Sequence, residues 1–133
     1  MGKKFFDLSR FRFDLQIFAN YGSMPTDQDL TGTSGSDSVS IDSFETTHNI
    51  KTGSGNDTIQ ISSTNSTSGT PNLNIYGEAD DDLISLGNVS VTTAMNLDGG
   101  EGNDSIIVES ATVSTASTLE AAFNVDGGAG SDL

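Results

Sequence analysis

Apolar residues recur in pairs along most of the chain, with one polar or small residue between the two members in most copies. Four such pairs are present: Val39/Ile41, Ile59/Ile61, Ile84/Leu86 and Ile106/Val108. A period of two is that of a β-strand with one buried face. Each pair therefore predicts a short, half-buried strand.

A six-residue segment ending in Asp precedes each pair, and a fifth copy stands near the end of the chain. The terminal residues of these segments are Asp37, Asp57, Asp82, Asp104 and Asp132, at intervals of 20, 25, 22 and 28 residues. An apolar residue two positions before each segment keeps the same intervals: Leu30, Ile50, Ile75, Leu97 and Val125. Because these features stay in register through spacers of unequal length, the chain is a repeat of strand, turn and strand.

A twelve-residue unit of this kind cannot bury its apolar face alone, whereas five stacked units share one continuous thin core. The pattern therefore predicts an all-β fold, a parallel β-solenoid of about five coils over residues 26–133, with the last repeat incomplete. Each coil is expected to carry one turn, and all turns are expected to lie at one edge. Residues 88–91 and 111–113 are expected to form return strands within the spacers.

The amino-acid composition excludes a helical bundle and every kind of site that requires cysteine. Ser, Thr, Asn and Gly supply 59 of the 133 residues, whereas a helical bundle is rich in Glu, Lys, Ala and Leu. The chain has no Cys, which excludes disulfides, zinc–thiolate sites and thiol chemistry.

The charge is strongly one-sided, with 19 acidic residues, 5 basic residues and a formal net charge of −14. From Phe13 onward, 18 acidic residues face a single base, Lys51. Duplex binding rests on basic phosphate contacts, so a nucleic-acid partner is excluded. The composition instead favours cations as partners.

Three of the turns carry a recognisable motif. Residues 99–104 (GGEGND), 127–132 (GGAGSD) and 52–57 (TGSGND) resemble the RTX, or hemolysin-type, calcium-binding repeat, Gly-Gly-x-Gly-x-Asp. The resemblance covers about the last hundred residues, with longer spacers than the tandem nonapeptide form. It implies a right-handed parallel β-roll in which Ca²⁺ lies between stacked turns, held by Asp carboxylates and backbone carbonyls.

The resemblance also implies a set of metal-site residues. Besides the five turn Asp residues, the candidates are Gly32, Gly35, Gly53, Gly55, Gly77, Asp80, Gly99, Gly100, Gly102, Gly127, Gly128 and Gly130. Ca²⁺ takes carboxylate and carbonyl oxygens, and glycines at the first, second and fourth turn positions are expected to supply positive φ values. Asp80 stands where a glycine is expected, and Asp adopts the left-handed region more easily than most residues. Five turns provide at most four inter-turn sites.

The acidic turns allow two other interpretations. Residues 98–109 have the length of an EF-hand loop, but Gly100 and Gly102 stand at side-chain ligand positions and Asn103 replaces the central Gly. Alternatively, each turn Asp caps its own backbone, as is common in isolated turns.

Residues 1–25 are different in character and contain five of the seven Phe residues. Their apolar positions fit a helix and a strand equally. The segment is predicted to be a cap for the open end of the solenoid or, alternatively, a docking or lipid-surface segment. Charged residues interrupt it, so neither a signal peptide nor a membrane span is expected.

The sequence thus predicts calcium binding and calcium-dependent folding in a secreted or surface-exposed bacterial protein, with type I secretion of the parent protein implied by the resemblance. The alternatives are a calcium-indifferent stalk of the adhesin or phage-fibre type, and an accessory module of a larger toxin or enzyme. No enzymatic activity is expected, because His48 and Lys51 are the only proton-handling or cationic groups after Arg12. The chain stops at Leu133, directly after the fifth turn Asp, so further repeats or domains are expected to follow. The sequence does not identify a cell-surface or matrix partner.

Overall fold

The computed structural model describes residues 18–21, 29–42, 48–65, 72–91, 94–113 and 123–133. Within these ranges every regular element is a β-strand. The strands are β1 (Phe18–Tyr21), β2 (Leu30–Thr31), β3 (Ser38–Ile41), β4 (His48–Ser54), β5 (Thr58–Asn65), β6 (Asn72–Ala79), β7 (Leu83–Val91), β8 (Ala94–Glu101), β9 (Ser105–Val113) and β10 (Phe123–Asp126). Apart from β1, the predicted N-terminal cap or docking segment lies outside the described residues.

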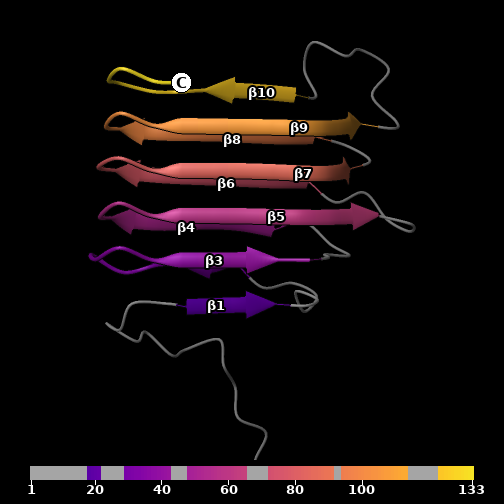
Figure 1. The fold of residues 1–133 in the computed structure, drawn as a ribbon, viewed down its shortest axis with the longest axis horizontal. Helices are drawn as coiled ribbons and strands as arrows, with labels where there is room; N and C mark the ends of the chain where they lie inside the picture. Colours follow the sequence, from indigo (N-terminus) through magenta and orange to yellow (C-terminus); the bar gives the residue numbers. More distant parts are fainter. Residues whose placement is uncertain (1–17, 22–28, 43–47, 66–71, 92–93, 114–122) are drawn as a thin grey trace, which may run out of the picture.

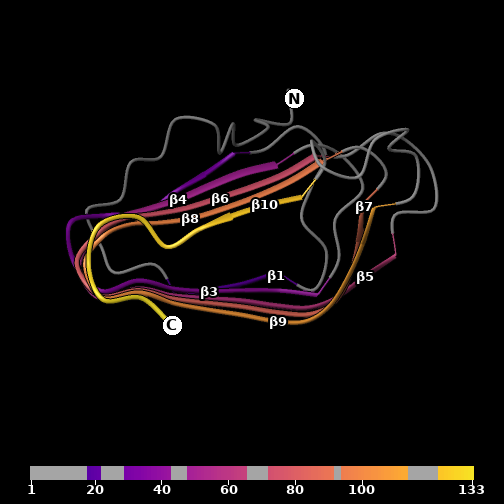
Figure 2. The same ribbon diagram turned by 90° about the horizontal axis from the view of Figure 1, so that it is seen from above.

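Consecutive strands alternate between two five-stranded sheets. One sheet has the order β1-β3-β5-β7-β9 and the other β10-β8-β6-β4-β2. All neighbouring strands run parallel. The strands form successive layers in Figure 1, and the two sheets face each other in Figure 2. The prediction of an all-β fold with parallel strands is confirmed.

The strand register follows the sequence repeat and does not depend on the unequal lengths of the spacers. In one sheet, Ile59 pairs with Val39 on one side and with Ile84 on the other. In the other sheet, Ile75 pairs with Ile50 and Leu97. A one-residue slip would turn every apolar side chain to the outside, so the pattern strongly specifies this register.

The core lies between the two sheets and consists almost wholly of aliphatic side chains. Its buried members are Leu30, Val39, Ile41, Ile50, Ile59, Ile61, Leu73, Ile75, Ile84, Leu86, Val89, Met95 and Leu97. At the C-terminal end the burial is weaker, because Ile106 and Val108 are only partly buried and Val125 is exposed. The core therefore stabilises the middle layers most.

The predicted return segments are strand residues, although they do not form separate strands. Residues 88–91 continue β7 and pair with β5 and β9, and residues 111–113 likewise end β9. The even-numbered strands of the facing sheet complete the return. In Figure 2, β5 and β7 bend toward that sheet in their second halves.

No helix in the described part of the chain is long and apolar enough to cross a membrane.

Candidate metal-binding edge

Five turns lie one above another at a single edge of the molecule (Figures 1 and 2). We number them in chain order: first (32–37), second (52–57), third (77–82), fourth (99–104) and fifth (127–132). We call the contact between two successive turns a junction. The tertiary structure thus brings the five predicted turn Asp residues into one column.

The Asp column is held together by hydrogen bonds between turns. Oδ1 of Asp57 accepts the backbone N–H of Asp37 at 2.7 Å, and Oδ1 of Asp82 accepts that of Asp57 at 2.8 Å. Oδ1 of Asp104 accepts the N–H of Asp82 at 2.8 Å, and Oδ1 of Asp132 that of Asp104 at 3.1 Å. Each of these carboxylates therefore caps the preceding turn, rather than its own backbone as the second interpretation predicted.

The second carboxylate oxygen has a different environment. Asp57, Asp82 and Asp104 are at most 4% exposed, and their Oδ2 atoms are buried without a hydrogen-bond donor among the described residues. An ionised oxygen without a partner is costly to bury, so such atoms normally hold a proton or contact a cation. The column therefore presents a row of buried acceptors.

Burial also changes the acidity of two members of the column. It raises the pKa of Asp82 from 3.8 to about 7, while the hydrogen bond from the Asp57 N–H opposes this rise and nearby carboxylates add to it. The pKa of Asp57 is likewise raised, chiefly by burial, with the Asp37 N–H and the Thr52 side chain acting in the opposite direction. At neutral pH, a proton or a cation that neutralises these buried carboxylates would therefore be stabilised in the column.

The first glycine of a turn is required for space and not for a positive φ. A Cβ at Gly99 would lie 2.5 Å from Asp104 Oδ2 and 2.6 Å from the carbonyl oxygen of Gly127. A Cβ at Gly77 would collide with Asp82 Oδ2 and Gly99 O in the same way. A carboxylate oxygen and a carbonyl oxygen of the next turn therefore converge beside each glycine, and neither can donate a hydrogen bond.

Positive φ values occur at the second and fourth positions, so the prediction for the first position was wrong. They belong to Gly53, Gly55, Gly100, Gly102 and Gly128 and to two other residues, Glu78 (81°) and Asp80 (76°). The left-handed conformation expected for Asp80 is confirmed, whereas that of Glu78 was missed. In the first turn, Gly35 has no positive φ, unlike its counterparts Gly55 and Gly102. The first turn is therefore built differently from the second, third and fourth.

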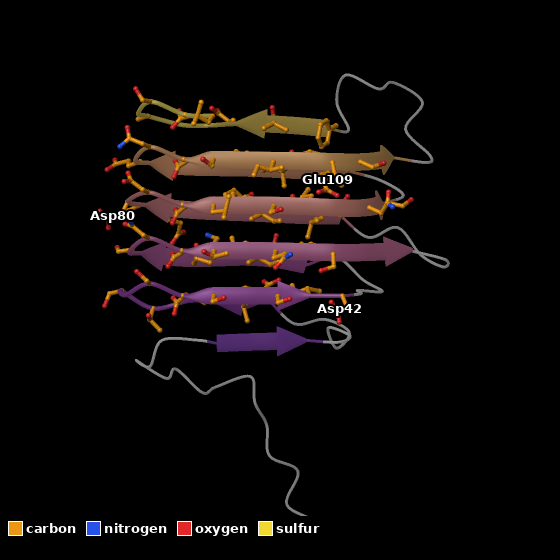
Figure 3. All side chains as sticks on the ribbon, in the orientation of Figure 1. Asp42, Asp80 and Glu109 are labelled. Carbon is orange, nitrogen blue, oxygen red and sulfur yellow. The ribbon has the colours of Figure 1, made fainter. Side chains whose placement is uncertain are left out.

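Asp80 was a candidate ligand, but its side chain lies outside the column. It is exposed, and its Oδ2 accepts the N–H of Gly55 at 3.0 Å. Figure 3 shows Asp80 at the outer margin of the turns, whereas Asp42 and Glu109 lie toward the other end of the strands. These three carboxylates do not join the buried row.

Among the described residues, no three acidic or histidine side chains converge on one point. The turn carboxylates are spread along the column instead, one in each turn. A cation at a junction would therefore draw on few carboxylates and on the backbone carbonyls of the turns.

A second ladder was missed by the sequence analysis. Asn74 Nδ2 donates to Asn49 Oδ1 at 2.8 Å, and Asn96 Nδ2 donates to Asn74 Oδ1 at 2.6 Å. Asn49 Nδ2 in turn donates to Asp29 Oδ1 at 2.9 Å, and Asn124 is in register with Asn96. The sequence contains a pattern that predicts this ladder, because an Asn or Asp precedes the leading apolar residue in all five repeats.

No protein-family model, curated protein sequence or solved structure matches this chain. Its function is therefore argued from the geometry of the turns.

Proposed function

We propose that the turn edge binds calcium ions between successive turns, and that the two sheets are the walls of an RTX-like β-solenoid with one turn in each coil. The strict alternation of consecutive strands between the two parallel sheets supports this arrangement. So does the gathering of all five turns at one edge.

One observation carries the calcium proposal: the buried, donor-free Oδ2 atoms of Asp57, Asp82 and Asp104. At the last two, a carbonyl oxygen of the next turn converges on the same space. Ca²⁺ is a hard cation that accepts about 6–8 oxygen ligands in flexible geometry, which suits carboxylates combined with carbonyls. Mg²⁺ demands a smaller, nearly ideal octahedron and fits such a backbone-lined space less well.

Calcium binding is expected to drive folding. The chain carries a net charge of −14, and the Asp column places like charges about 4.8 Å apart, one strand spacing. Each Ca²⁺ neutralises two of these charges, and its binding free energy adds to the free energy of folding. Affinities of about 10⁻⁴–10⁻³ M are typical of extracellular calcium modules. The protein would then fold outside the cell, in keeping with a secreted or surface-exposed bacterial protein.

The second candidate function is a calcium-indifferent structural stalk, either alone or as an accessory module of a larger toxin or enzyme. The Asn ladder favours it, because this ladder and the aliphatic core hold successive layers together without any metal.

Calcium titration of the full chain separates the two candidates. Far-UV circular dichroism and isothermal titration calorimetry are recorded first in chelator and then with rising CaCl₂, with MgCl₂ as a control at equal ionic strength. We expect a gain of β signal and a heat of binding with CaCl₂ that MgCl₂ does not reproduce. An identical spectrum in chelator and in about 5–10 mM CaCl₂, without a heat of binding, would favour the stalk.

A further inference from the structure

We propose that calcium enters only two of the four junctions, those between the third and fourth turns and between the fourth and fifth turns. Thr33 supplies hydrogen-bond donors to Asp37 at the first junction. At the second junction the Thr52 side chain takes the place of the cation, although Asp57 Oδ2 has no donor among the described residues. This inference rests on the proposed calcium function and assigns its sites.

The two C-terminal junctions contain only acceptors. At the third junction, Asp82 Oδ2 and the Gly99 carbonyl oxygen converge beside Gly77, and the carboxylate oxygen has no donor among the described residues. At the fourth junction, Asp104 Oδ2 and the Gly127 carbonyl oxygen repeat this arrangement beside Gly99. The glycines contribute no side chain, so either a proton on the carboxyl or a bound cation is needed between the facing oxygens, and in CaCl₂ the cation displaces the proton.

The second junction has the same frame but a different residue at the first position. Thr52 replaces glycine there and is fully buried, with 0% exposure. Its Oγ1 donates to the carbonyl oxygen of Gly77 at 3.1 Å. That carbonyl is the counterpart of the Gly99 and Gly127 carbonyls at the next two junctions. The hydroxyl proton thus satisfies the carbonyl oxygen that would otherwise face a cation, whereas Asp57 Oδ2 remains without a donor among the described residues. In this proposal the Thr52 side chain, which stands where the third and fourth turns have glycine, excludes the cation by occupying its space.

The first junction is closed by Thr33 from within the first turn. Its N–H donates to Asp37 Oδ2 at 2.6 Å. Its hydroxyl oxygen lies 3.3 Å from Oδ1 and 3.2 Å from Oδ2 of the same carboxylate. Asp37 therefore has protein donors at the oxygen that lacks one in Asp82 and Asp104.

The molecule accordingly has two differently stabilised parts. The first three turns are joined without metal and form a base. The fourth and fifth turns need calcium to neutralise their junctions, and they belong to the end of the molecule where the apolar core is thinnest. Calcium-dependent folding would then be strongest in the C-terminal layers, which the two ions join to the first three turns.

Counting bound ions tests the inference. Calorimetry and native mass spectrometry of the full chain with CaCl₂ are expected to give two ions. Thr52→Gly opens the second junction and should raise the count to three, whereas the matched control Thr52→Ser keeps a hydroxyl and should stay at two. A count of four in the parent protein, or no gain in Thr52→Gly, overturns this inference while calcium binding stands. A count of zero overturns the proposed function as well.

A second pair of variants tests the inference even if the Thr52→Gly protein does not fold. Gly77→Thr copies the second turn into the third and should lower the count from two to one, with folding checked by circular dichroism in saturating CaCl₂. Asp37→Asn should still bind two ions, because the Thr33 N–H can donate to the amide oxygen. A parent-like count in Gly77→Thr, or a lost ion in Asp37→Asn, contradicts the assignment.

Discussion

The carboxylate of Asp104 accepts the backbone N–H of Asp82 at 2.8 Å through one oxygen, and its other oxygen is buried without a donor in the described structure. One side chain thus joins the third and fourth turns through one oxygen and presents an unsatisfied acceptor to the next junction, between the fourth and fifth turns, through the other. A structural role and the proposed metal-binding role are combined in the same residue, and substitutions can separate them.

Asp104→Ala should therefore be far more harmful than Asp132→Ala. The first removes the acceptor of the Asp82 N–H inside the column, and a buried donor without a partner costs about 1–3 kcal/mol. The second also removes an acceptor, that of the Asp104 N–H, but this bond is longer (3.1 Å) and belongs to an exposed residue at the end of the column. We expect a large loss of folded fraction and of calcium cooperativity for Asp104→Ala, and a small shift in midpoint for Asp132→Ala. Calcium titrations followed by circular dichroism at one ionic strength compare them, and equal effects would mean that the turns act independently.

The stability of the calcium-free protein should fall as the pH rises. The pKa of Asp82 is about 7 in the folded chain, above its ordinary value of 3.8, so the folded state binds this proton more tightly than the unfolded state. The resulting stabilisation is complete below about pH 4 and is lost as the pH rises through about 7. In chelator, the melting temperature at pH 5 should exceed that at pH 7.5.

Asp82→Asn is the control for this pH effect. The amide oxygen can still accept the Asp57 N–H but no longer titrates, so the difference between pH 5 and pH 7.5 should shrink. With saturating CaCl₂ the parent protein should show the opposite trend, because protons compete with the cation for the carboxylate. A calcium-free melting temperature that rises with pH would contradict the burial of an ionisable Asp82.

Asn74→Ala should destabilise the protein equally with and without calcium. The substitution breaks two bonds of the Asn ladder, those to Asn49 and Asn96. We expect a loss of about 1–2 kcal/mol in the free energy of unfolding, measured by urea titration. Gln60→Ala, at an exposed position of β5, should change it by less than about 0.5 kcal/mol. A loss of stability confined to the calcium-bound protein would show that the Asn ladder depends on the turn edge.

Ile75→Ala and Ile107→Ala form a matched pair for the core. Ile75 is fully buried between the sheets, whereas Ile107 is 50% exposed. The buried substitution should lower the free energy of unfolding by about 2–5 kcal/mol, through lost apolar contact and the cavity that remains. The exposed substitution should cost much less. Similar losses in saturating CaCl₂ would contradict the position of the core.

The sequence by itself determined where the repeated strands lie, that neighbouring strands are parallel, and in which register they pair. Residues such as Ile59 and Ile84 occupy equivalent positions in neighbouring repeats, and in a stack of parallel strands equivalent positions become neighbours in space. For the same reason the Asp column could be predicted from the turn spacing, and the Asn ladder was predictable from the Asn or Asp before each leading apolar residue.

Only the tertiary structure decided what each turn residue contacts. Asp104 caps the third turn because the neighbouring N–H lies within reach of one oxygen, and its second oxygen lacks a donor because the next turn presents a carbonyl there. Gly99 is needed for the space between those oxygens, a requirement that no local backbone preference reveals. Thr52, at the equivalent position of the second turn, has a side chain whose hydroxyl reaches the carbonyl oxygen of Gly77, 25 residues along the chain. Such differences depend on contacts between distant residues, and the motif alone does not encode them.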